Sequence, residues 1–169
     1  MIKNIITQLS LIQELIPEKF EFTNPEFEEE SKEYWACRFK INNEIVLYRK
    51  AKITPTKIGQ FVTIWKREVK GPIAPFHADD DFDLVIIFTV KENEIGQFVF
   101  PKSVLVSKGI VSTNVKEGKR GFRVYPPWDA AINKQAIRTQ KWQLNYFLKI
   151  TDNSINKAKA QELFMLNEN

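Results

Sequence analysis

The chain has 169 residues, a length that fits one compact domain burying roughly 70% of the surface of its unfolded chain. Hydrophobic residues make up 43% and charged residues 27%, which excludes a disordered chain and indicates a globular protein with a packed core. Because Cys37 and His77 are each the single residue of their type, we exclude an intrachain disulfide and a zinc site that needs several such ligands.

The first 17 residues predict an amphipathic helix that ends at Pro17. Apolar side chains recur at helical spacing along one face, at Ile2, Ile5, Ile6, Leu9, Ile12 and Ile16. This segment is too polar for a signal peptide or a membrane span, so we predict a cytoplasmic protein without a membrane partner. We treat residues 1–169 as a single domain.

Charge is segregated along the chain, although the net charge is only +4. Residues 14–33 hold eight Glu against two Lys and have no clear period, which predicts an irregular, solvated crossing with at most a short helix. Residues 49–67, here called the basic stretch, carry cations and no acid, and this pattern indicates a surface for an anionic partner. Its cations are Arg49, Lys50, Lys52, Lys57, Lys66 and Arg67.

The rest of the pattern predicts a mixed α/β fold with a central sheet covered on both faces. Residues 34–41 and 44–53 flank Asn42-Asn43, which favours a hairpin with a tight turn. Residues 84–90 are apolar on both sides, as a buried central strand requires. Further strands are predicted at 60–66, 95–100 and 121–125, and helices at 102–108, 130–148 and 154–166.

The predicted helix over residues 130–148 carries a second, aromatic face opposite its apolar stripe. The stripe consists of Ile137, Leu144 and Leu148, and the second face of Arg138, Trp142 and Tyr146. This second face either packs between the sheet and the last helix or is available for stacking on bases.

Residues 118–129 place cations and aromatic rings around a predicted strand. The glycines at 118 and 121 flank Lys119 and Arg120, and backbone flexibility there would let both cations meet phosphates. Alternation sends Arg123 and Tyr125 to the same side of the strand. A solvated hairpin explains the pattern equally well, and no phosphate-binding loop motif is present.

A metal-dependent nuclease would need carboxylates for Mg²⁺ and a nearby lysine. The acid-x-Lys motif is incomplete before both Lys52 and Lys102, because Lys50 and Phe100 occupy the acid position. Catalysis would therefore require another acid, with Asp83, Glu33 and Glu44 as the candidates. The aspartates at 79, 80, 81 and 83 do not match a calcium loop, which leaves a solvent loop or a Mg²⁺ site.

Several long motifs between Tyr34 and Leu148 resemble the MepB family. They are RKAKITPTKIGQFVTIWKR at 49–67, FVFPK at 98–102, GKR at 118–120, RVYPPWD at 123–129 and TQKWQ at 139–143. The resemblance implies a restriction-endonuclease-like α/β fold, which is widely used by proteins that bind or cut nucleic acid. It also implies a link to a bacterial multidrug-efflux operon, since the family takes its name from a gene in that setting.

We therefore predict a nucleic-acid-binding protein on a nuclease-like scaffold, without efficient catalysis and without a cofactor. The predicted partner is DNA or RNA, single strands included. The alternatives are a nuclease that uses Mg²⁺ and a regulatory or protein-interaction module. The predicted contact residues are Lys52, Lys57, Trp65, Lys66, Arg67, Lys102, Lys119, Arg120, Arg123, Tyr125, Trp128, Arg138 and Trp142.

Overall fold

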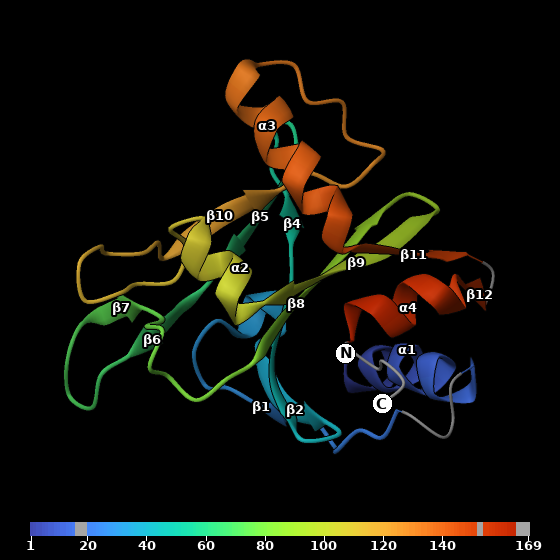
Figure 1. Ribbon diagram of the computed structural model, residues 1–169, viewed down its shortest axis with the longest axis horizontal. Helices are drawn as coiled ribbons and strands as arrows, with labels where there is room; N and C mark the ends of the chain where they lie inside the picture. The colour runs from blue at the N-terminus through green and yellow to red at the C-terminus, as the bar shows by residue number, and fades with distance from the viewer. Residues whose placement is uncertain (16–19, 152–153, 165–169) are drawn as a thin grey trace.

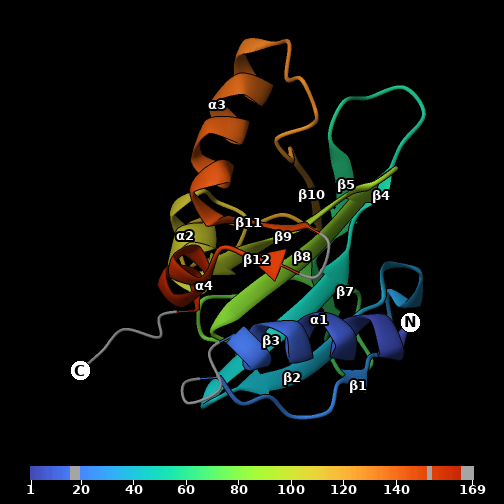
Figure 2. The ribbon, with the colours of Figure 1, turned by 90° about the vertical axis from the view of Figure 1, so that its right-hand side faces the viewer.

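A central mixed sheet with a layer on each face organises the computed structural model, which describes residues 1–15, 20–151 and 154–164 (Figures 1 and 2). The seven described strands of this sheet run in the order β1-β2-β3-β8-β9-β11-β12, with β3 and β8 parallel and all other neighbours antiparallel. They are β1 (Glu26–Phe27), β2 (Cys37–Ile41), β3 (Glu44–Lys50), β8 (Leu84–Lys91), β9 (Glu94–Pro101), β11 (Phe147–Thr151) and β12 (Ser154–Ile155). The predicted α/β class with a central mixed sheet and flanking helices is confirmed.

Two helices cover one face of the sheet, α1 (Ile2–Leu15) and α4 (Lys157–Leu163). The predicted first helix forms as α1 and buries Ile5, Leu9 and Ile12 against β2, β3 and β8. The predicted positions of Ile16 and Pro17 lie outside the described residues. None of the helices in the described part of the chain has both the length and the apolar character that a membrane span requires.

The opposite face carries two small sheets and two helices (Figure 1). The elements of this layer are β4 (Lys52–Ile53), β5 (Gln60–Thr63), β10 (Gly121–Val124), β6 (Trp65–Arg67), β7 (Ile73–Pro75), α2 (Lys102–Ser107) and α3 (Lys134–Gln143). One sheet has the order β10-β5-β4 and the other pairs β6 with β7. This layer is the part of the molecule that holds most of the predicted contact residues.

The centre of the sheet agrees with the sequence prediction. β8 is buried over its first six residues, with Ile86 in the core under α1 and α4 and Ile87 in the core on the opposite face. The predicted hairpin also forms, since β2 pairs with β3 and Asn42 has a positive φ of 53° in the turn.

Two strand predictions were wrong in their extent. The predicted strand at 60–66 is divided into β5 and β6, which belong to different sheets, with the buried Ile64 between them. The second hairpin arm, predicted to reach residue 53, ends at Lys50. The N–H of Ala51 donates to the carbonyl of Phe88 at 2.9 Å, and the next two residues pair with β5 instead.

The two C-terminal helix predictions were also wrong in their extent. α3 starts after Asn133, whose side chain accepts from the N–H of Ala136 at 2.8 Å, and it gives way to a 3₁₀ turn at Leu144–Tyr146. The chain then joins the sheet as β11, because pairing with β9 buries both Phe147 and Leu148, and this tertiary gain overrides helix propensity. The helix predicted from 154 begins only after the short strand β12.

Candidate nucleic-acid interface

The acidic segment at residues 28–33 lies against the basic stretch and neutralises much of it. The segment runs into a single-turn 3₁₀ helix, Lys32–Tyr34. It contacts β5 through the hydroxyl of Thr63, which donates to Ser31 Oγ at 3.2 Å. Three ion pairs join the two segments: Arg49–Glu28 at 2.8 Å, Arg67–Glu30 at 2.6 Å and Lys52–Glu33 at 2.6 Å. We call Arg49, Lys52 and Arg67 the paired cations.

Arg49 is part of the protein core, with 0% of its side chain exposed. Burial lowers the pKa of Arg49, and the nearby carboxylate of Glu28 opposes that shift. Its Nη1 also donates to the carbonyl of Tyr48 at 2.9 Å. The first cation of the basic stretch is therefore structural and does not face a ligand.

Three further predicted contact residues are held by local partners. Lys66 lies 2.7 Å from Asp80 and 3.2 Å from Glu68. Burial alone would lower the pKa of Lys66, but hydrogen bonds to these two carboxylates outweigh it and raise the pKa above its usual value. Lys102 is the second of these residues, and its Nζ donates to the carbonyls of Ala78 and Asp80 at 3.0 and 2.7 Å. Arg120 is the third, and it forms an ion pair with Glu117 at 3.1 Å.

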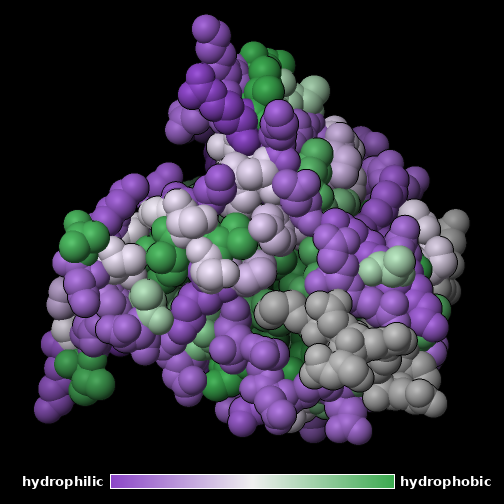
Figure 3. Space-filling view, viewed as in Figure 1, coloured by the Kyte–Doolittle hydropathy of each residue, from purple (hydrophilic) through white to green (hydrophobic). Residues whose placement is uncertain are grey.

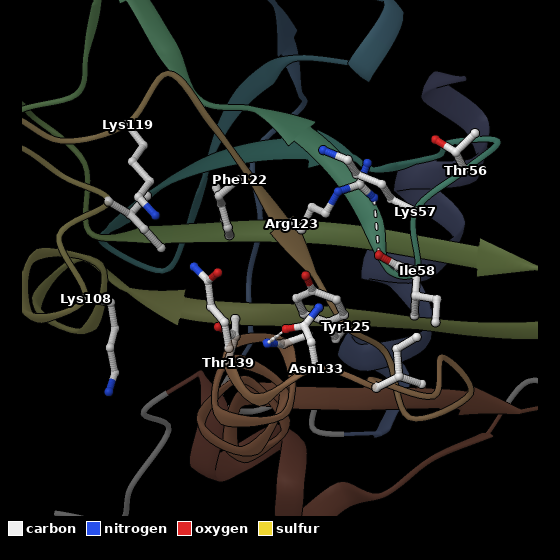
Figure 4. Close-up of a pocket in the computed structure, with 14 residues that line it drawn as sticks. Thr56, Lys57, Ile58, Lys108, Lys119, Phe122, Arg123, Tyr125, Asn133 and Thr139 are labelled. Atoms are coloured by element: carbon white, nitrogen blue, oxygen red, sulfur yellow. Dashed lines mark hydrogen bonds between the residues drawn. The ribbon is translucent and has the colours of Figure 1, made fainter.

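A groove on the same side of the sheet gathers cations that are not neutralised. It has a volume of about 610 Å³ and is bordered by the loop at 54–59, β10, the end of α2, and the first half of α3 (Figure 4). We call its four basic residues the groove cations: Lys57, Lys108, Lys119 and Arg123. Among the described residues, none that lines the groove is acidic and none of the groove cations forms an ion pair.

Arg123 links β10 to the loop at 54–59. Its Nη2 donates to Thr54 Oγ1 at 2.6 Å, and its Nη1 donates to the carbonyls of Ile58 and Gly59 at 3.4 and 3.2 Å. These acceptors are all uncharged, so the guanidinium keeps its full positive charge while its position is fixed. These hydrogen bonds also hold the loop at 54–59 in place, and this loop carries Lys57.

Lys119 is placed by close backbone packing and not by the flexibility expected for Gly118. A Cβ at Gly118 would collide with the carbonyl of Ile110, and the N–H of Gly118 donates to Ser112 Oγ at 2.7 Å. The N–H of Lys119 in turn donates to Ile110 at 2.9 Å. Glycine is therefore needed for close approach, which fixes the backbone beneath Lys119.

Tyr125 lines the groove directly after β10 and is held from two sides. Its N–H donates to Gln143 Oε1 at 2.8 Å, and its carbonyl accepts from Gln140 Nε2 at 3.3 Å, so α3 fixes its backbone. A Cβ added at Gly59, which has a φ of +83°, would lie 2.7 Å from the Tyr125 ring. The ring therefore packs against the loop backbone while it also faces the groove.

The tryptophans predicted to stack on bases lie outside the groove lining. Trp65 is in β6, with the Arg67 guanidinium 5.8 Å from its ring centroid. The Trp128 ring packs edge-on against Phe147 at 5.6 Å, with its Nε1 buried. The Trp142 ring packs on Phe100 at 5.5 Å, while Arg138 is exposed on the same helix. Trp142 is nevertheless near the groove, because Lys108 Nζ lies 5.3 Å from its ring.

The carboxylates and lysines of the nuclease alternative are brought together in two places. Glu33 pairs directly with Lys52. Asp83 is adjacent to Lys102 through a backbone hydrogen bond of 2.9 Å, but its carboxylate accepts from the N–H of Ile45 at 2.8 Å. No group of three carboxylate, His or Cys side chains within the described residues could hold a metal ion together. The alternative function as a nuclease that uses Mg²⁺ therefore remains a prediction from the sequence.

Sequence reasoning missed one cation and the polar wall of the groove. Lys108 was predicted only as the last residue of a short helix capped by Gly109, and its place in the groove depends on tertiary contacts that no local signal encodes. Asn133, Gln135 and Thr139 of the helix α3 region also face the groove. In the space-filling view, hydrophilic side chains border the indentation between α3 and the lobe of α2 and β10 (Figure 3).

The described residues thus define a mixed α/β protein with an acid-free, cation-lined groove. The MepB-like family model matches residues 28–149. The crystal structure of MepB is similar at 38% identity and a TM-score of 0.75, covering 88% of this chain and 97% of that chain. The chain belongs to the MepB-like family, which confirms the resemblance.

A second solved structure is similar at a much lower level. The bacterial homing endonuclease I-Ssp6803I matches with 12% identity and a TM-score of 0.44, covering 83% of this chain and 88% of that chain. A search of the curated proteins found no match.

Proposed function

We propose that this protein binds nucleic acid, either DNA or RNA, through the groove. The observation that carries the proposal is the convergence of four cations from separate parts of the chain on one hollow without an acidic lining residue. Cations gathered in a concavity raise the local potential and attract polyanions, and such charge is most effective when no carboxylate neutralises it.

The amino end of α3 adds to the positive potential. Ala136 and Gln135 of its first turn line the groove, and that turn contains no acid. The partial positive charge at a helix amino end favours phosphate. In this proposal the groove cations contact phosphates, and the paired cations contribute to stability instead.

The proposal assigns no catalytic step to the protein. Both lysines of the nuclease alternative are engaged, Lys52 by the carboxylate of Glu33 and Lys102 by the backbone carbonyls of Ala78 and Asp80. Binding without efficient cleavage therefore agrees with these contacts, and it needs no metal or cofactor.

A salt titration tests the proposal. The affinity for a fluorescent single-stranded oligonucleotide is measured by anisotropy at increasing salt, and a plot of log K against log salt is expected to be linear. Three or four phosphate contacts predict a slope of about −2 to −3, since each neutralised phosphate contributes about −0.7 for single strands. A flat response, or the absence of binding at low salt, would overturn the proposal.

A further inference from the structure

The groove has lysines at its two ends, and its middle combines the Tyr125 ring with the Arg123 guanidinium. Figure 4 shows Lys108 and Lys119 on one side and Lys57 on the other, with Arg123 and Tyr125 between them. A ligand that fits this arrangement carries negative charge at two points and a flat group between them. This charge pattern is that of a short stretch of a nucleic-acid strand.

We propose that the groove binds an unpaired strand, with one base against the Tyr125 ring and successive phosphates at the two groups of cations. The proposal rests on the proposed function and adds the strandedness of the ligand and the residue that contacts the base. Base stacking on an aromatic ring is tolerant of sequence, because every base has a flat π-face.

Tyr125 is prepared for such a contact by its surroundings. The backbone bonds to Gln140 and Gln143 fix it, and Gln143 is fully buried, so little freedom remains to be lost on binding. The ring rests on the Gly59 backbone. Within the described residues, no group hydrogen-bonds the phenol oxygen, which leaves it for the ligand.

The remaining lining offers apolar and uncharged polar surface to a base and a sugar. Ile58 and Ile132 line the groove although they are 39% and 77% exposed, so apolar surface is available to a bound base or sugar. The amide of Gln135 and the hydroxyl of Thr139 offer both donors and acceptors without charge. Such groups can donate to and accept from the edge of a base.

A paired duplex does not fit this site in the same way. Its bases are stacked inside, so a base reaches Tyr125 only after it leaves the stack, which costs unpairing free energy. A volume of about 610 Å³ is in the range of pockets for small organic ligands, which admits one or two nucleotides. An already unpaired strand avoids the unpairing cost and should be preferred.

The test compares the affinity of the protein for three probes that have the same number of phosphates per strand. The probes differ in whether unpaired bases are present. They are a labelled oligothymidylate of about 12 nucleotides, the same backbone with abasic sites throughout, and a blunt duplex of equal length. We expect the wild-type protein to bind the oligothymidylate about 10-fold more tightly than either of the other probes. Unlabelled thymidine monophosphate serves as a competitor and is expected to bind far more weakly than the strand.

Variants then assign the effect to the ring. Tyr125→Leu should lose about 10-fold in affinity for the oligothymidylate but little for the abasic strand, while Tyr125→Phe should retain most of the affinity. Trp65→Leu, which changes a ring outside the groove, is the matched control and should bind as the wild type does. Circular dichroism confirms that each variant is folded.

The possible failures are distinguishable. If no probe binds at low salt, the proposed function fails and this inference fails with it. If all three probes bind equally, or if Tyr125→Leu binds the oligothymidylate as tightly as the wild type, the protein binds nucleic acid but not an unpaired base at Tyr125. If thymidine monophosphate competes as well as the strand, the groove is a mononucleotide site and the inference is wrong.

Discussion

Two basic regions on the same side of the sheet differ in how their charge is balanced. The paired cations of the basic stretch each have a carboxylate from residues 28–33 within 2.8 Å. The groove cations form no ion pair in the described part of the chain, and the acceptors that hold Arg123 are uncharged. The first region is the denser run of charge in the sequence, yet the second is the one whose cations form no ion pair among the described residues.

The difference shows that charge density along a sequence does not measure the charge presented to a ligand. Lys57 lies within the basic stretch but reaches the groove, because the loop at 54–59 carries it away from the acidic segment. Arg67, ten residues later, is held by Glu30, and this partner raises its pKa. Tertiary structure therefore separates Lys57, which lines the groove, from the paired cations of the same run.

The largest expected effect is on the stability of the paired region. Arg49→Ala leaves Glu28 without its partner and removes a fully buried side chain, so the free energy of unfolding should fall by about 3–5 kcal/mol. Urea denaturation measures this change. The double variant Arg49→Met/Glu28→Gln removes both charges and keeps the volume, so it should lose much less. A loss below about 1 kcal/mol for Arg49→Ala would show that the pair is not structural.

The next effect concerns the wall of the groove. Gly59→Ala places a Cβ against the Tyr125 ring at a φ of +83°, and should cost about 1–3 kcal/mol in urea denaturation. Gly71→Ala is the comparison, in a half-buried turn where φ is not positive and the added Cβ would lie 3.1 Å from the Glu68 Cβ, and it should cost less than Gly59→Ala. Equal effects of the two substitutions would contradict the described packing of Tyr125 on the loop.

Removing the carboxylates should make the two regions more alike. In the double variant Glu30→Gln/Glu33→Gln, Arg67 and Lys52 lose their partners and become able to meet a polyanion. The affinity for a single-stranded oligonucleotide at low salt should rise about threefold, and the gain should disappear at high salt, where exposed charges are screened. Glu92→Gln, in the exposed turn between β8 and β9, is the control for a general change in net charge. A similar rise in the control would show that pairing is irrelevant.

The smallest expected effect depends on pH. Burial, followed by the charge of Asp83, raises the pKa of Glu44. A raised pKa in the folded state means that the protonated form is favoured, so its stabilising contribution is present at low pH and is lost as pH rises through the folded-state pKa. Glu44→Gln should therefore stabilise the fold by a few tenths of a kcal/mol at pH 7 and by less near pH 4, where the carboxyl is largely protonated. A gain that grows on acidification would contradict this assignment.

The parts of the fold that sequence predicted correctly are those fixed by local chemistry. The apolar run at 84–90 became the buried strand β8, and Asn42 adopted the positive φ that the hairpin turn needs. The helix predicted through residue 148 was wrong because Leu144, Phe147 and Leu148 suit either a helix or a buried strand. Phe147 and Leu148 form a strand because β9 has a free edge with which residues 147–150 pair, and this contact cannot be read from the local sequence.

The site was less predictable because it depends on contacts between distant segments. The sequence shows the acids at 28–33 and the cations at 49–67, but no spacing reveals which carboxylate meets which cation. It also does not reveal that Lys108 and Lys119 line the same groove as Lys57, which lies on a different part of the chain. Four of the predicted contact residues line the groove, namely Lys57, Lys119, Arg123 and Tyr125.

The most direct test compares the salt dependence of oligonucleotide binding in two matched double variants. Lys57→Gln/Lys119→Gln removes two groove cations, and Lys52→Gln/Arg67→Gln removes two paired cations. The account predicts that the first variant reduces the steepness of the slope of log K against log salt by about 1.4, and that the second leaves it unchanged. A slope that changes only in the second variant would contradict the claim that the groove, and not the basic stretch, presents charge to the ligand.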